Sequence, residues 1–197
     1  RDADLVLHLP LRWEDETRIT PIRDLLPGQT VQIQAVVREA SVAYRPRRML
    51  TLTVEDASGV LGMRFLNFYP SHLKLFQPGE SFRFRGDIRG GFIGLEMVHP
   101  RFVKADDATP LPTQFTPVYP TTAGLGQATL RKLVTRALEA PIHDTLPADW
   151  LSELRLPELE ASIRLLHQPP PDNALTELES RRHPAWQRLA FDELLAQ

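Results

Sequence analysis

An alternation of apolar and polar side chains with a period of two runs through the middle of the chain and constrains its fold more than any other feature. Val31, Ile33, Ala35 and Val37 alternate with polar residues, and Val36 alone breaks the pattern. This period places every second side chain on one face of a β-strand, so that face can be buried. Four further stretches are predicted as strands: residues 50–55, 60–67, 82–89 and 92–103.

The residues between these strands indicate how they connect. Asp56–Gly59 is typical of a turn, Gly90-Gly91 is typical of a tight hairpin turn, and Pro70 can begin a short helix through Phe76. Pro100 marks an edge or a bulge in the last strand. Five strands with a short helix between the third and fourth are typical of the OB-fold, a five-stranded Greek-key barrel. Another small β-barrel or half of a β-sandwich is the alternative.

The flanking segments predict helices and irregular pieces. Residues 1–30 read as a helical or irregular linker, residues 31–105 as the OB-fold, and residues 106–197 as helices joined by proline-rich loops. The predicted fold class is therefore β-rich α+β, with a five-stranded OB-fold barrel between a short N-terminal segment and a helical C-terminal part. Apolar residues in Gln127–Ala140 follow the 3.6-residue period of a helix. Further helices are expected at residues 147–154, 157–167 and 184–195.

The net charge of −2 hides an uneven distribution along the chain. Residues 31–105 hold 11 Lys and Arg against 6 Asp and Glu, or +5, whereas residues 106–197 hold 8 against 13, or −5. A segment at +5 attracts phosphate groups, although an ordinary solvated surface would have the same composition.

The sequence lacks the motifs of several enzyme classes. It has no G-x-x-x-x-G-K-[ST] loop for ATP phosphates, no G-x-S-x-G elbow, no H-E-x-x-H pair and no cysteine. Glu14-Asp15-Glu16 reads as a solvated face, and Gly124-Leu125-Gly126 reads as the start of a helix. No run of 18 apolar residues predicts a membrane span. We therefore expect no catalytic residue, metal site or cofactor site in this chain.

The sharpest local pattern lies in the loop between the first two predicted strands. Tyr44, Arg45, Arg47 and Arg48 stand within five successive positions there, around Pro46. Guanidinium groups suit phosphate oxygens, a tyrosine ring can stack on a base, and proline stiffens the loop. OB-folds bind nucleic acids through this loop and one face of the sheet. The loop is therefore predicted to contact nucleic acid, with a solvated hairpin tip as the alternative.

A second candidate surface lies on the third and fourth predicted strands. If Leu61, Met63 and Phe65 face the core, the intervening side chains lie on the opposite face and can contact unpaired bases and their backbone. The alternative is that the apolar members pack under the short helix or against a neighbouring domain. The residues of this surface are Arg64, Leu66 and Phe68 with the adjoining Tyr69 on the third strand, and Arg83, Arg85 and Arg89 on the fourth.

Several segments, spread over nearly the whole chain, resemble those of the bacterial RecG helicases in the same order and at similar spacing. They include an HLPxRYxD segment, the third strand of the family's wedge domain, a TPVYPTT…LRK segment and the approach to the motor domain. The matching residues here are Leu7–Asp15, Gly62–Phe68, Thr116–Thr122 with Leu130–Lys132, Leu166–Pro170 and Arg188–Leu195.

The resemblance implies an ATP-driven translocase on double-stranded DNA that rewinds stalled replication forks and migrates Holliday junctions in DNA repair and recombination. Its OB-fold wedge would split the arms at the branch point while the motor pulls duplex. Both motor lobes, with ATP and Mg²⁺, are expected beyond Gln197, so this chain alone would bind branched DNA without hydrolysing ATP. The implied partners are branched DNA, the motor domains of the same chain and a single-strand DNA-binding protein, at the nucleoid in the bacterial cytoplasm.

The sequence departs from the family pattern where contact with bases is expected. The family's wedge can carry an aromatic residue immediately before the asparagine of the third strand and another four residues later, and here these positions are Leu66 and Pro70. The resemblance therefore implies that Leu66 separates the strands, with Phe68, Tyr69 or Tyr44 supplying the ring. A protein-interaction module and an RNA-binding OB module are the alternative functions.

Overall fold

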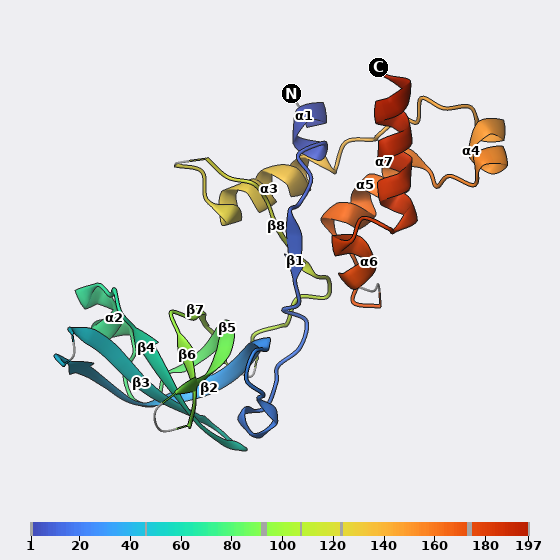
Figure 1. Cartoon of the computed structure of the whole chain (residues 1–197). Helices are drawn as coiled ribbons and strands as arrows, with labels where there is room; N and C mark the ends of the chain where they lie inside the picture. The colour runs from blue at the N-terminus through green and yellow to red at the C-terminus, as the bar shows by residue number, and fades with distance from the viewer. Residues whose placement is uncertain are drawn as a thin grey trace. The chain divides into compact units, whose positions relative to one another are not determined.

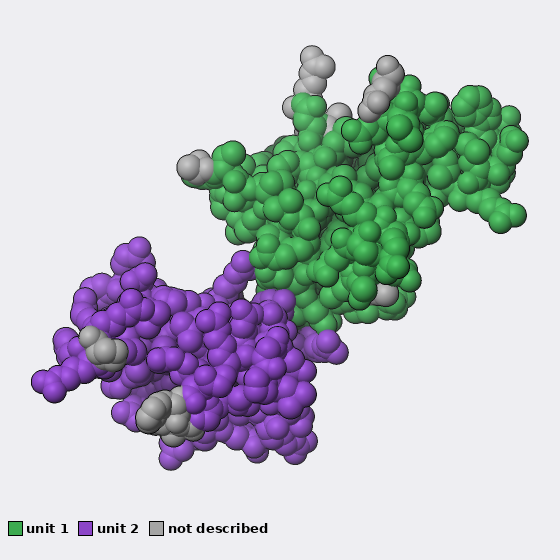
Figure 2. Space-filling model, in the orientation of Figure 1, with its two compact units in different colours: residues 1–17, 112–197 green, residues 18–111 purple. Residues whose placement is uncertain are grey.

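Two compact units make up the computed structural model: a barrel unit, residues 18–111, and a helical unit, residues 1–17 and 112–197 (Figure 2). The sequence predicted consecutive segments instead, with residues 1–30 as a separate linker. Pro46, expected to stiffen its loop, and Phe92, expected to begin the last strand, lie outside the described residues. The structure describes residues 2–45, 47–91, 94–106, 108–122, 124–172 and 175–196.

Five strands of the barrel unit pair in a closed ring (Figure 1). The ring runs β2–β3–β4–β6–β5 and returns to β2; the β4–β6 pairing is parallel and the others are antiparallel. A short helix, α2, connects β4 to β5. This order, with a helix between the third and fourth strands along the chain, β4 and β5, is that of the OB-fold, so the predicted fold class is confirmed. The elements are β2 (Thr30–Ala43), β3 (Met49–Asp56), β4 (Gly59–Phe65), α2 (Pro70–Leu75), β5 (Ser81–Gly91) and β6 (Gly94–Val98).

The long strand β2 closes the barrel because it pairs with different strands along its length. Residues 30–36 pair with β5, and residues 36–43 pair with β3. The register shifts between Val37 and Glu39, which is a β-bulge that bends the strand. Of the inward-facing residues predicted from the alternation, Ile33, Ala35 and Val37 are buried, and Val31 is partly buried against the core. The strand β2 thus pairs with β5 through its first half and with β3 through its second half, which closes the barrel.

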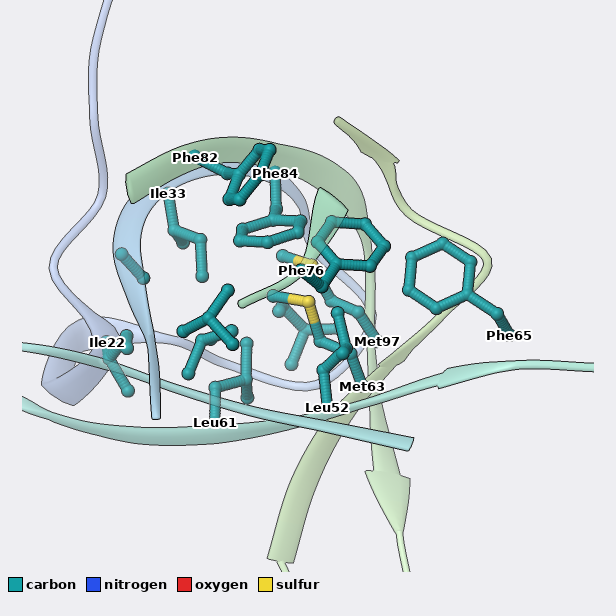
Figure 3. Close-up of a cluster of buried hydrophobic side chains, with 14 of the residues drawn as sticks. Ile22, Ile33, Leu52, Leu61, Met63, Phe65, Phe76, Phe82, Phe84 and Met97 are labelled. Atoms are coloured by element: carbon teal, nitrogen blue, oxygen red, sulfur yellow. The ribbon is translucent and has the colours of Figure 1, made fainter. Parts of the chain in front are cut away.

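Aromatic side chains fill much of the barrel core (Figure 3). Phe76, directly after α2, is fully buried, and its ring centroid lies 5.1 Å from that of Phe82 and 6.1 Å from that of Phe84. Pro70 occupies the first turn of α2, as predicted, where its missing N–H removes no helical hydrogen bond. The helix therefore covers the core by inserting the residue at its C-terminal end.

The last predicted strand, residues 92–103, is wrong as a single strand. Among the described residues it consists of β6 and β7 (Arg101–Lys104), which pair with opposite halves of β5. The chain turns at His99, whose φ is 53°, and at Pro100, which has no N–H to donate to a ladder. Pro100 packs closely on β5, because a Cβ at Gly86 would come within 3.3 Å of the Pro100 Cα. The proline marks a corner of the barrel.

The helical unit contains four of the predicted helices. Three agree closely with prediction, whereas the helix that begins at Gln127 ends at Ala137 and not at Ala140. The sequence analysis did not predict α6 or the three-residue strands β1 and β8, which pair antiparallel. Among the described residues, no helix is long and apolar enough to cross a membrane. The elements are α1 (Asp2–Val6), β1 (Arg12–Glu14), β8 (Thr116–Val118), α3 (Gln127–Ala137), α4 (Ala148–Leu154), α5 (Leu159–His167), α6 (Leu175–Glu179) and α7 (Pro184–Leu195), while the barrel unit adds the short 3-10 helix η1 (Ile22–Asp24).

Buried hydrogen bonds hold together distant segments of the helical unit. The Trp13 indole Nε1 donates to the carbonyl oxygen of Leu166 at 2.8 Å. The ring of His167 bridges the Val6 carbonyl, 2.8 Å from Nε2, and the Tyr119 hydroxyl, 2.9 Å from Nδ1. Burial lowers the pKa of His167, which favours the neutral ring that can donate to one group and accept from the other. The N-terminal segment is thereby fixed to the C-terminal part of the chain.

A buried arginine links α7 to two other parts of this unit. Arg188 is fully buried and donates to both carboxylate oxygens of Asp144, at 2.6 and 2.8 Å, to Asp192 at 3.2 Å and to the Pro157 carbonyl at 3.0 Å. The side-chain hydrogen bonds from Arg188 hold the pKa of Asp144 well below the ordinary 3.8 of an aspartate, although burial acts in the opposite direction. The ionised carboxylate is therefore part of the folded structure.

We predict that Asp144→Asn lowers the free energy of unfolding of the helical unit by about 3 kcal/mol at neutral pH, because the buried guanidinium of Arg188 loses its bidentate carboxylate partner and keeps only the longer contact with Asp192. A carboxylate whose pKa is lower in the folded state stabilises the fold at pH values above its unfolded-state pKa. This stabilisation is lost as the pH falls toward the folded-state pKa. The difference in free energy of unfolding between the unaltered chain and Asp144→Asn should thus be constant at neutral pH and shrink below about pH 4. Urea denaturation at several pH values measures it. Asp172→Asn, at an exposed carboxylate, is the control, and equal losses for both variants would contradict the prediction.

Candidate nucleic-acid interface

The turn between β2 and β3 projects an exposed, cationic loop. The ladder between these strands ends at the pair Ala43 and Met49, so residues 44–48 form the turn, which we call the arginine loop. Tyr44 is 72% exposed, and Arg45, Arg47 and Arg48 are also exposed. The predicted residues of this loop therefore face solvent, where phosphates can reach their guanidinium groups.

A second predicted segment lies at the end of β4. The strand ends at Phe65, which pairs with Leu50 at the start of β3, and residues 66–69 then lead into α2; we call them the β4–α2 segment. Tyr69 is 72% exposed, Leu66 is half-buried, and Phe68 packs partly against the barrel core. Leu66 and Phe68 thus lie beyond the strand whose outward face they were predicted to share with Arg64.

The arginine loop and the β4–α2 segment touch each other. The guanidinium carbon of Arg48 lies 4.6 Å from the centroid of the Phe68 ring, a cation–π contact. Figure 1 shows the β2–β3 turn and α2 on the same side of the barrel. Two stretches that the sequence singled out separately therefore form one surface, which combines exposed guanidinium groups with aromatic and apolar side chains. Such a surface suits the backbone and the unpaired bases of a nucleic acid.

Arg64 lies beside this surface, but its charge is offset. Leu61, Met63 and Phe65 are buried as predicted, and Arg64 points to the opposite face, where it forms an ion pair with Glu96 on β6. The pair leaves Arg64 42% exposed at its side chain. It is thus available to a ligand only in competition with the carboxylate.

The prediction that Arg83 is exposed is wrong. Phe82 and Phe84 do face the core, but Arg83 on the opposite face is buried under residues 108–111. Its Nε donates to Gln34 at 2.9 Å, one terminal nitrogen donates to the Pro110 carbonyl at 2.9 Å, and the other donates to the Thr109 carbonyl. The period of two correctly gave the face of the strand but could not show that another segment covers it.

The other two arginines of β5 differ from Arg83. Arg85 is half-buried and lies opposite Arg101 in the β5–β7 ladder. Arg89 is exposed and lies 3.7 Å from Asp87. The strand pairings place Arg85 between Gln32 and Arg101, and Arg89 opposite Glu96.

Two features of this region were missed by the sequence analysis. A groove of about 660 Å³ runs over β3, β4 and β6, lined by Thr51, Thr53 and Gly62 among others. The glycine within β4 was a signal for it, because no heavy atom lies within 4 Å of the position its Cβ would take. His99 is the second, since its ring nitrogen Nε2 accepts a hydrogen bond from the Leu66 backbone N–H at 3.1 Å.

The closed five-stranded ring defines an OB-fold module, and one end of it carries a cationic surface with aromatic side chains. Comparison with known proteins then gives the family. The family model described as the RecG wedge domain matches residues 2–140. The chain belongs to the RecG family.

Individual relatives agree with this assignment. The chain is 43% identical to the ATP-dependent DNA helicase RecG of Escherichia coli K12 and 39% identical to that of Haemophilus influenzae, with 98% of this chain covered in each case. It spans 28% of the length of each relative. A solved structure of RecG bound to a three-way DNA junction aligns over 98% of this chain and 26% of that chain, with a TM-score of 0.69 and 22% identity, which shows a shared fold.

We predict that Arg83→Ala lowers the free energy of unfolding of the barrel unit by about 1–3 kcal/mol, because carbonyls of residues 109 and 110 lose a charged donor. Its effect on nucleic-acid affinity should be small, since the side chain is covered. Arg89→Ala removes an exposed arginine from the same strand and should change stability by about 0.5 kcal/mol or less. Urea denaturation compares the two variants. An Arg83→Ala protein as stable as the Arg89→Ala protein would refute the buried role.

Proposed function

We propose that this chain binds branched DNA, such as replication forks and Holliday junctions, and that its barrel unit is the wedge that splits the arms at the branch point. The arginine loop would hold phosphates beside the branch, and the β4–α2 segment would meet the bases that have just been separated. The contact between Arg48 and Phe68 carries this proposal, because it joins a phosphate-binding element to an aromatic one at a single place.

The family relation supports the proposal from a second direction. Relatives over almost the whole of this chain are named ATP-dependent DNA helicases, and the similar fold comes from a RecG structure bound to a three-way junction. A wedge within such a protein would convert translocation along duplex into separation of the arms. RNA binding would use the arginine loop and the Phe68 ring in the same way, so the choice of branched DNA rests on the family relation.

The remaining activities belong, in this proposal, to the longer protein. A motor holding ATP and Mg²⁺ would pull the duplex, and the 197-residue chain would bind DNA without hydrolysing ATP, since its sequence has no phosphate-binding loop motif. The whole protein would act in DNA repair and recombination at the nucleoid in the bacterial cytoplasm. A single-strand DNA-binding protein, present where forks stall, is a proposed further partner.

We predict that the triple variant Arg45→Ala, Arg47→Ala and Arg48→Ala binds a three-way junction more weakly than the unaltered chain and with a shallower dependence on salt. Each phosphate contact that is lost releases about one counterion fewer on binding, so the slope of log affinity against log salt should fall by about 3 if all three arginines contact phosphates. Fluorescence anisotropy with a labelled junction over a series of salt concentrations measures both quantities.

The control for this experiment removes the same charge from the helical unit. Lys132, Arg136 and Arg182 are exposed there, and their triple alanine variant has the same net charge as the arginine-loop variant. It should keep the junction affinity and the salt slope almost unchanged. If the two triple variants lose affinity equally, binding depends on overall charge and the arginine loop is not the site. Competition with RNA and with linear duplex in the same assay tests the choice of branched DNA.

We further predict that Phe68→Leu weakens junction binding by about 1–3 kcal/mol, the usual contribution of one stacked base, and leaves the stability of the barrel almost unchanged. Leucine keeps most of the apolar packing against the core but has no π face. Leu66→Ala should reduce the preference for junctions over linear duplex, because it removes the apolar contact at the branch. Unchanged junction preference in both variants would exclude the β4–α2 segment from base contact.

A further inference from the structure

His99 adopts a backbone conformation that is costly for its residue type. Its φ of 53° lies in the left-handed region, which β-carbon sterics disfavour for residues other than glycine. The other described positions with positive φ hold four glycines, Gly28, Gly79, Gly94 and Gly124, and two arginines, Arg155 and Arg181. Glycine would meet the backbone requirement at position 99 without strain. The side chain is what histidine adds at this position, so its contacts decide whether it has a role of its own.

The side chain and the backbone of His99 both hold the end of β4. The His99 backbone N–H donates to the Arg64 carbonyl at 2.8 Å, and Nε2 accepts from the Leu66 N–H at 3.1 Å. The imidazole also meets the Phe65 ring edge-on, with centroids 6.1 Å apart. Three successive residues of the chain leaving β4 are thus in contact with one residue at the corner between β6 and β7.

The hydrogen bond to Leu66 acts where strand pairing has ended. The β4 ladder with β3 ends at Phe65, and its ladder with β6 ends at Arg64. The next amide along the chain, that of Leu66, donates to the imidazole instead. This bond extends the fixed part of the backbone by one residue into the β4–α2 segment, and it sets the direction in which the chain leaves the barrel toward Phe68.

We propose that His99 is a positioning residue that orients the β4–α2 segment for contact with the separated bases of a DNA junction. The imidazole accepts the Leu66 amide through Nε2, and the left-handed backbone at the corner places the ring where it can do so. This role rests on the proposed function, since the orientation of the segment matters only if that segment meets bases. His99 acts through Leu66 and the residues after it, and the arginine loop is independent of it.

Two substitutions distinguish the effect of the His99 side chain from that of its backbone conformation. His99→Gly keeps the left-handed conformation without strain but removes the acceptor, whereas His99→Gln places an amide oxygen close to the position of Nε2. We expect His99→Gly to increase hydrogen exchange at the Leu66 amide in the free chain. It should also weaken three-way junction binding about fivefold, the equivalent of one ordinary hydrogen bond, with linear duplex binding unchanged. His99→Gln should restore both Leu66 protection and junction affinity, and thermal melting verifies that both variants fold.

The outcomes distinguish this proposal from the proposed function. If the unaltered chain shows no preference for junctions over duplex, the proposed function fails. If the unaltered chain prefers junctions and His99→Gly binds them equally well, the positioning role alone is refuted. It is also refuted if His99→Gln loses as much affinity as His99→Gly although Leu66 stays protected, because the imidazole would then contact the DNA itself. Loss in the glycine variant with recovery in the glutamine variant supports it.

Discussion

The bend in β2 is the constraint on which the candidate interface depends. Because a bulge after Val37 lets one strand pair first with β5 and then with β3, the sheet closes, and the second half of β2 forms a hairpin with β3. The turn of that hairpin is the arginine loop. Closure also aligns the start of β3 with the end of β4, through the pair Leu50 and Phe65, which brings the β4–α2 segment within reach of Arg48.

The sequence predicted the barrel well because its signals are local. A period of two indicated the strands and their buried faces, Asp56–Gly59 indicated one turn, and Pro70 indicated α2. Gly90 and Gly91, predicted as a tight turn, lie instead in the β5–β6 ladder. The β1–β8 ladder was not predictable in this way, since three-residue strands have no measurable period and their partners are distant in the chain. For the same reason the alternation placed Arg83 on the outer face of β5 but could not show the cover formed by residues 108–111. The contact of Arg48 with Phe68 and the role of His99 likewise depend on pairing between strands.

The net charge of +5 counted for residues 31–105 overstates the charge that is available to a ligand. Arg64 is paired with Glu96, Arg83 is occupied by carbonyl groups, and Arg89 lies close to Asp87. In the helical unit Arg188 is neutralised by two aspartates, although its sequence neighbourhood resembles any amphipathic helix. Among the described residues of the barrel unit, Arg48 of the arginine loop is exposed and also lies over an aromatic ring, that of Phe68. The place of each arginine in the sheet, and the carboxylates and carbonyls beside it, decide more than the net charge of the segment which guanidinium groups can contact phosphate.

The segments that resemble the RecG family serve different purposes in the two units. In the helical unit Trp13, Tyr119 and His167 are buried and hydrogen-bonded to one another's segments, so similarity there reflects a shared core. In the barrel unit the departure from the family pattern falls at the surface. Pro70, which begins α2, has no aromatic ring, whereas the neighbouring Tyr69 is exposed. In the proposed function a ring displaced by one residue, on a backbone held at Leu66, would meet the base at the branch, so the departure would change which side chain makes the contact.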